Sequence, residues 1–202
     1  LALKAWGDRS RFAGAKDRAG VSGLVLDVLR KRRSLAWRMD ADTPRALALA
    51  ALALEWGWPV EKVAEAAGEA PHGPGPLTDA EWSALRAPQD LDAAPPAVRG
   101  DYADWLDPSF ARAFGEGRAE EGAALARRAP VDLRVNRLKS NPVRALKALA
   151  SLEPQAPGRL EDAIRLPAPD PTRRGGAVET IPAFSKGWFE VQDLGSQIAA
   201  AC

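Results

Sequence analysis

The chain has 202 residues, of which 46% are hydrophobic, and this is enough to form one or two folded domains. No apolar run approaches the roughly 20 residues that span a bilayer, and one cysteine with one histidine excludes an internal disulfide and a multi-thiolate zinc site. We therefore expect a cytoplasmic protein without a membrane segment or a bound metal.

A formal net charge of +1 conceals a strong polarity along the chain. Residues 1–39 carry 10 basic and 3 acidic side chains, residues 40–125 carry 6 and 16, and residues 126–202 carry 12 and 8. Two basic ends around an acidic middle indicate an anionic partner that contacts the ends. The same pattern arises when the segments neutralise one another within the fold, and both interpretations remain open.

Residues 1–128 predict a bundle of helices. After an exposed segment, residues 16–38 place apolar side chains on one helical face and end in four consecutive cations: Arg30, Lys31, Arg32 and Arg33. Cations near a helix C-terminus favour the helix dipole without any ligand. The same four side chains would also form a phosphate-binding patch. The two interpretations have about equal weight.

The acidic middle predicts further helices. Thr43 and Pro44 begin an apolar helix that runs to Gly57 and should be buried, and residues 78–81 form a capping box for another helix. Helices are also expected around residues 105–114 and 118–128. The single histidine, His72, lies in a Pro/Gly loop and is expected to be exposed to solvent rather than to act as a base.

The pattern changes at residue 129. Residues 131–136 alternate as a strand, and Asn141 caps a helix. Residues 163–166, 178–181 and 187–192 predict three more strands, and a helix follows Asp193. The order β-α-β-β-β-α predicts a small α/β domain over residues 129–202, so the fold class is mainly α with a small α/β domain.

Catalytic patterns are absent from the sequence: it has no Gly-rich phosphate loop, no metal-ligand cluster and no Ser/His/Asp set. Cys202 follows three alanines that supply no base, so we do not expect it to be a nucleophile. The strongest signal is basic and lies at the end of the first strand, where phosphate contacts from Arg and Lys and a base contact from Asn are expected: Arg134, Asn136, Arg137 and Lys139. The alternative is a polar strand face paired with Glu190 and Gln192.

Three segments together resemble the Sun/Fmu type of bacterial ribosomal RNA cytosine-5 methyltransferases. They are residues 11–18 (RFAGAKDR), 129–139 (APVDLRVNRLK) and 187–197 (GWFEVQDLGSQ). The resemblance covers nearly the whole chain. It implies a helical RNA-binding domain similar to the antitermination factor NusB over residues 1–128, followed by a small RNA-recognition domain over residues 129–202.

In this family a Rossmann-like domain then binds S-adenosylmethionine and carries the two catalytic cysteines. The chain ends about where that domain would begin, and Cys202 matches neither cysteine. The resemblance therefore implies an RNA-binding, substrate-orienting region for 16S rRNA that holds no cofactor and transfers no methyl group alone. Its partners would be ribosomal RNA and its own catalytic domain, and we expect a monomer.

The resemblance also assigns roles to matching positions. Residues 16–18 and 30–33 would contact RNA or form internal salt bridges, and residues 134, 136 and 139 would face RNA or the cofactor domain. Gln192, Asp193 and Ser196 would lie at the junction with the cofactor domain. A function of a different class is a stand-alone NusB-like adaptor that binds proteins in transcription antitermination, and the salt dependence of RNA binding separates the two.

Overall fold

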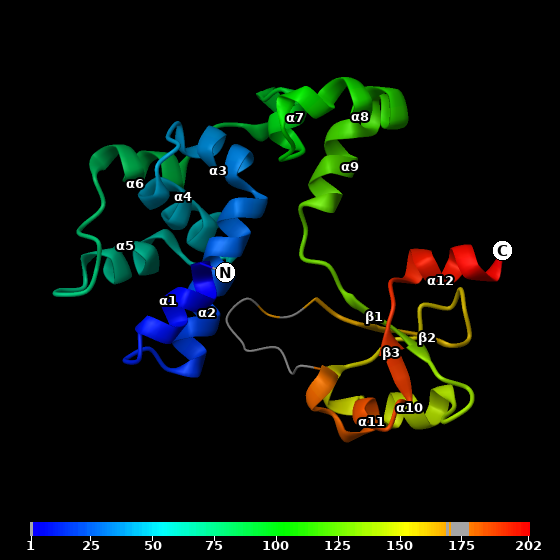
Figure 1. Ribbon diagram of the computed structural model, residues 1–202. Helices are drawn as coiled ribbons and strands as arrows, with labels where there is room; N and C mark the ends of the chain where they lie inside the picture. Colours follow the sequence, from blue (N-terminus) through cyan, green and yellow to red (C-terminus); the bar gives the residue numbers. More distant parts are fainter. Residues whose placement is uncertain (1, 169, 171–177) are drawn as a thin grey trace. The chain divides into compact units, whose positions relative to one another are not determined.

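The computed structural model describes residues 2–168, 170 and 178–202, and it is mainly helical with one small antiparallel sheet (Figure 1). The chain divides into two compact units, residues 1–127 and 128–202. Within the described ranges, no helix combines the length and the apolar character that crossing a membrane requires.

The first unit consists of helices joined by short turns. Single 3₁₀ turns lie at Leu91–Ala93, Asp104–Leu106 and Gly115–Gly117, and a π-helical turn, Ala51–Glu55, continues α4. The α-helices are α1 (Ala2–Arg9), α2 (Ala15–Arg30), α3 (Arg32–Met39), α4 (Pro44–Ala50), α5 (Val60–Gly68), α6 (Asp79–Arg86), α7 (Pro96–Arg99), α8 (Asp107–Phe114) and α9 (Arg118–Leu125).

The core of the first unit lies around α3 and α4. Leu35 and Val63 are almost fully buried there, and α4 contributes Leu47 and Leu49. The prediction of a buried apolar helix after Thr43 is confirmed, and the Thr43 hydroxyl accepts a hydrogen bond from the backbone N–H of Ala46 as an N-cap should. The predicted capping box at residues 78–81 is also present.

The prediction of one helix over residues 16–38 was wrong, because the chain breaks at Lys31 (φ −119°, ψ 25°). The physical reason is distant in sequence. The carboxylate of Asp101 accepts the backbone N–H groups of Arg33 and Ser34 at 3.0 and 2.9 Å, and the Ser34 hydroxyl at 2.6 Å. A new helix therefore begins where periodicity alone predicts continuation.

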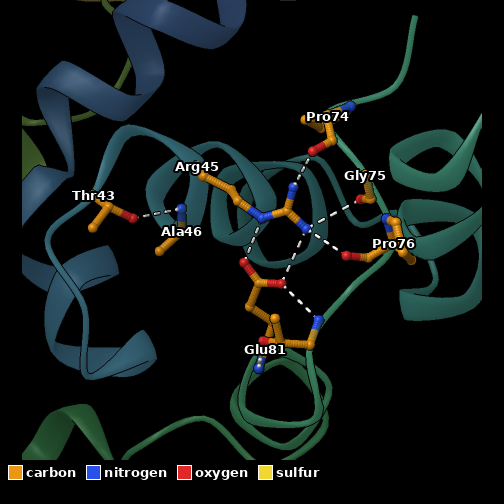
Figure 2. A network of polar contacts seen from close by, with 8 residues as sticks. Thr43, Arg45, Ala46, Pro74, Gly75, Pro76 and Glu81 are labelled. Carbon is orange, nitrogen blue, oxygen red and sulfur yellow. Dashed lines mark hydrogen bonds and ion pairs between the residues drawn. The ribbon is translucent and has the colours of Figure 1, made fainter. Parts of the chain in front are cut away.

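Arg45 on α4 holds the predicted loop of residues 70–76 (Figure 2). Its guanidinium donates to the carbonyl oxygens of Pro74, Gly75 and Pro76 at 2.8, 3.1 and 2.8 Å. It also donates twice to the Glu81 carboxylate, at 2.6 and 3.1 Å. One side chain thus joins α4, the loop and the start of α6. His72 in this loop is exposed, as expected.

The second unit is built on a sheet in the order β2-β1-β3, with both pairings antiparallel. Leu133, Val135, Ile164 and Phe189 form its buried core, together with the apolar face of α10. The elements are β1 (Val131–Val135), α10 (Pro142–Ala148), a 3₁₀ turn (Ala150–Leu152), β2 (Ala163–Leu166), a 3₁₀ turn (Val178–Thr180), α11 (Pro182–Ser185), β3 (Phe189–Val191) and α12 (Leu194–Ala201).

The predicted order β-α-β-β-β-α needs one correction: residues 178–181 are not a strand. Val178–Thr180 form a 3₁₀ turn, and the backbone N–H of Ile181 donates to the Val178 carbonyl at 3.1 Å. Pro182 then opens α11. A proline has no N–H for a strand ladder but fits the first turn of a helix, so this segment turns instead of extending.

Candidate nucleic-acid interface

The basic run at residues 30–33 is ion-paired within the first unit. Arg30 contacts Asp27 at 3.4 Å, and Lys31 pairs with Glu55. Arg32 holds Asp42 through two hydrogen bonds of 2.9 and 2.8 Å, which lower the pKa of that carboxyl. Arg33 donates to Asp104 at 2.6 Å and to a backbone carbonyl. The run therefore carries intramolecular contacts that serve the fold.

The other predicted contact region of the first unit, residues 16–18, has mixed roles. The Asp17 carboxylate accepts the backbone N–H of Gly14 and completes the cap of α2. Arg18 donates to the Gly7 carbonyl at 3.4 Å. Lys16 is exposed and makes no side-chain hydrogen bond or ion pair with the described residues.

The predicted site residues of β1 separate into different roles. Arg134 is exposed on the sheet face opposite the core and lies across from Glu190. Arg137 is engaged by Glu161 at 3.0 Å and by Asp162, and these hydrogen bonds raise its pKa. Asn136 is structural: its side-chain oxygen accepts the N–H of Leu138 at 3.1 Å, and its own N–H donates to the Trp188 carbonyl at 2.9 Å.

Lys139 is placed by this turn. The Lys139 N–H donates to the Asn136 carbonyl at 3.0 Å, and its side chain crosses the backbone of Gly187. A Cβ on Gly187 would lie 2.9 Å from the Lys139 Nζ, and the Gly187 φ is +68°. The positive φ favours glycine at this position, whereas the flexible end of Lys139 could move away from a Cβ. The ammonium group of Lys139 therefore lies beside the backbone of Gly187, the residue before Trp188.

Two cations lie close to the ring of Trp188. The Asn141 side chain caps α10 and accepts the N–H of Arg144 at 2.9 Å, and the Arg144 guanidinium lies 3.8 Å above the indole centroid. Lys186 Nζ lies 5.7 Å from the same centroid. Such contacts are cation–π interactions. We call Lys139, Arg144, Lys186 and Trp188 the Trp188 cluster. Sequence reasoning did not place Arg144 or Lys186 beside Trp188, because a contact between Arg144 and Trp188 depends on the tertiary fold.

The three cations of the Trp188 cluster are exposed. None makes a side-chain hydrogen bond or ion pair with a carboxylate within the part of the chain that the structure describes. This distinguishes them from residues 30–33. Unneutralised cations around an aromatic ring are the arrangement with which proteins contact nucleic acid strands.

The predicted interface residues Gln192, Asp193 and Ser196 form the corner between β3 and α12. Asp193 caps α12 by accepting the N–H of Ser196 at 3.1 Å. The Gln192 N–H donates to the Asp132 carbonyl at 3.0 Å, and its own carbonyl accepts the buried Gln197 side chain at 2.8 Å. These contacts stabilise the corner, and a role toward a cofactor domain stays a prediction.

Sequence reasoning missed the residue that organises this corner, Asp132. It is buried, accepts two hydrogen bonds from Arg165 at 2.7 and 2.9 Å, and accepts the N–H of Leu194 at 3.0 Å. The bonds from Arg165, followed by the one from Leu194, lower its pKa against the effect of burial. In the sequence, Asp132 is a polar residue at a position where the alternating strand pattern already predicts one, so nothing marked it as buried.

The described residues show no other chemical centre. Cys202 is exposed, and no three His, Cys, Asp or Glu side chains gather as a metal site in the ranges that the structure covers.

Comparison with known proteins adds an independent observation. No protein-family model matches the chain. Over 102 residues, 49% of its length, it is 32% identical to the probable ribosomal RNA small subunit methyltransferase B of Synechocystis sp.. That stretch is 22% of the relative, so the chain spans about a fifth of the length of the curated relative it matches. Over about half its length the chain is thus similar to a protein of the methyltransferase B type, and the Sun/Fmu resemblance is confirmed to that extent.

Proposed function

We propose that this chain is the RNA-docking and substrate-orienting region of an S-adenosylmethionine-dependent 16S rRNA cytosine-5 methyltransferase. The similarity to a small-subunit rRNA methyltransferase supports ribosomal RNA as the partner and does not favour the antitermination adaptor. In this proposal the first unit is the NusB-like domain and the second presents the RNA-binding surface. Arg134 and the Trp188 cluster are the contacts.

One observation carries the proposal: the second unit keeps cations without carboxylate partners, whereas the first unit neutralises its basic run. Arg134 and Lys139 are exposed and make no side-chain ion pair within the described ranges. Arg32 and Arg33 are both bound to aspartates. A folded protein gains stability by pairing such charges, so cations left exposed together suit an external polyanion.

The described residues offer no Rossmann-type site for S-adenosylmethionine. Nucleotide-type cofactors bind where parallel strands lead through Gly-rich turns into helices, and this sheet is antiparallel. The two strand-to-helix connections are closed by the chain's own side chains, since Asn141 caps α10 and Asp193 caps α12. We therefore assign cofactor binding and methyl transfer to another part of the parent enzyme.

A salt titration tests RNA docking. The 202-residue chain should bind a 16S rRNA fragment with an affinity that falls steeply with salt. Arg134→Ala and Lys139→Ala should each weaken binding and reduce the slope of log affinity against log salt by about 1, as expected for one lost phosphate contact.

A matched control is Arg99→Ala, because Arg99 in the first unit already donates to Glu120 at 2.9 Å. It should leave the slope unchanged. Affinity that does not depend on salt, or slopes that are the same in all three variants, would contradict the proposal.

A further inference from the structure

The Arg144–Trp188 contact leaves the donors of an arginine unused. The Cζ atom of the Arg144 guanidinium lies over the indole ring of Trp188, 3.8 Å from its centroid. Arg144 is exposed, and its guanidinium N–H groups donate to no acceptor within the ranges that the structure describes. The guanidinium N–H groups of Arg144 are therefore accessible to a ligand.

The first unit contains a second arginine–tryptophan stack that shows the contrast. The Arg86 guanidinium lies 4.3 Å from the Trp82 centroid and also donates to Glu61 at 3.3 Å. A carboxylate thus occupies the donors of Arg86. No carboxylate among the described residues accepts a hydrogen bond from the Arg144 guanidinium, although Arg144 lies closer to its tryptophan ring than Arg86 does, at 3.8 Å against 4.3 Å.

A guanidinium held over an indole by a cation–π contact is partly preorganised for a ligand. Its planar outer face can stack on a nucleobase while its in-plane N–H groups reach a base edge or a phosphate. Cation–π contact with Trp188 and the cap from Asn141 restrict Arg144 before any ligand arrives, so less conformational entropy is lost on binding. Lys186 lies near the same ring and Lys139 lies beside the neighbouring Gly187, so both suit contacts with the phosphates of a bound strand.

This arrangement distinguishes between forms of RNA. Bases in an A-form duplex are stacked on their neighbours and do not offer a free face, whereas bases in single-stranded loops and ends do. We propose that Arg144, held by Trp188, is a stacking site for an unpaired RNA base, so that this surface selects single-stranded segments. The inference rests on the proposed function and deepens it by naming the form of RNA bound.

The test compares the whole chain and its variants on two labelled RNAs: a short unstructured single strand, and the same strand annealed to its complement. Fluorescence anisotropy gives both affinities at matched salt. The wild-type chain should prefer the single strand. Arg144→Lys keeps the charge but removes the plane, so it should weaken single-strand binding at least about fivefold, given that one stacked base contributes about 1–3 kcal/mol. Duplex binding and the salt slope should stay the same.

The matched control is Arg86→Lys. It alters the Arg86–Trp82 contact, in which Glu61 already accepts a hydrogen bond from the arginine, and it should change neither affinity. Thermal melts followed by circular dichroism verify that both variants fold. If Arg144→Lys binds the single strand like wild type, or if wild type binds both RNAs equally, the stacking site is overturned while RNA docking stands. If neither RNA shows salt-dependent binding, the proposed function fails, and the stacking site with it.

Discussion

Asp132 and Arg165 face each other across the β1–β2 ladder, and the carboxylate that accepts both arginine donors also accepts the N–H of Leu194. The side chain of Asp132 is 6% exposed and that of Arg165 is 37% exposed. The carboxylate is therefore almost completely desolvated, while the guanidinium keeps contact with water. One buried acid thereby joins β1, β2 and the start of α12.

We predict that Asp132→Ala destabilises the chain by roughly 1–3 kcal/mol or more, because it leaves a buried backbone N–H and an arginine without an acceptor. The lowered pKa of Asp132 sets the pH dependence. Its contribution is present above the ordinary aspartate pKa of about 4 and is lost as the pH falls through the lowered value. Urea unfolding between neutral and acidic pH measures both effects. An acid dependence that is identical in wild type and Asp132→Asn would contradict this assignment.

For Asp101 we predict the opposite pH dependence of stability. Burial raises its pKa against the hydrogen bonds from Ser34 and Arg33, which lower it. Ionisation of this carboxyl therefore costs stability as the pH rises through its pKa. Asp101→Asn should retain the two backbone hydrogen bonds and be nearly neutral, whereas Asp101→Ala should lose the cap of α3 and about 1–2 kcal/mol. Thermal unfolding of the two variants tests this, and equal destabilisation by both would refute the capping role.

The loop held by Arg45 provides a third prediction. Arg45→Ala should cost about 1–3 kcal/mol, because Glu81 and three backbone carbonyls lose their donor together. Arg45→Lys keeps the charge but not the planar fork and should recover only part of the loss. Protease cleavage in residues 70–76 should accelerate in Arg45→Ala. If cleavage there stays as slow as in wild type, other contacts hold the loop.

The paired arginines provide a fourth prediction. Arg32 and Arg137 already give their donors to carboxylates, so their removal should weaken RNA binding less than removal of Arg134 or Lys139. Arg32→Ala should also change stability by less than about 1 kcal/mol, because the Arg32–Asp42 pair is exposed. Anisotropy titrations of the four alanine variants rank the contributions. A larger effect for Arg32 than for Lys139 would place the RNA on the first unit.

Local signals predicted much of the fold. The cap at Thr43, the capping box at residues 78–81 and the alternating pattern of β1 depend on neighbouring residues, and each is present. The break at Lys31 was missed because its cause, Asp101, is far away in sequence. The strand predicted at residues 178–181 failed because a short apolar segment before Pro182 suits a turn as well as a strand.

For the candidate site, residue type was a weaker guide than pairing. The sequence offered two basic groups, residues 30–33 and residues 134–139, but it did not show which of their cations are paired. The fold separates them, because pairing with aspartate or glutamate depends on tertiary contacts. The sequence shows that Trp188 follows a glycine, but it does not show that Arg144 of α10 contacts this tryptophan. That contact depends on the sheet and on the cap of α10 by Asn141.

The buried side chain of Gln197 bears on where the polypeptide of the second unit can be truncated. Its side-chain amide on α12 donates to the Gln192 carbonyl at 2.8 Å and to the Leu133 carbonyl of β1 at 3.3 Å. A polypeptide that stopped after β3 would leave these carbonyls without the Gln197 donor and the Asp132 carboxylate without the N–H of Leu194. The first turns of α12 therefore contribute to the stability of this unit, and a domain boundary for expression belongs after this helix.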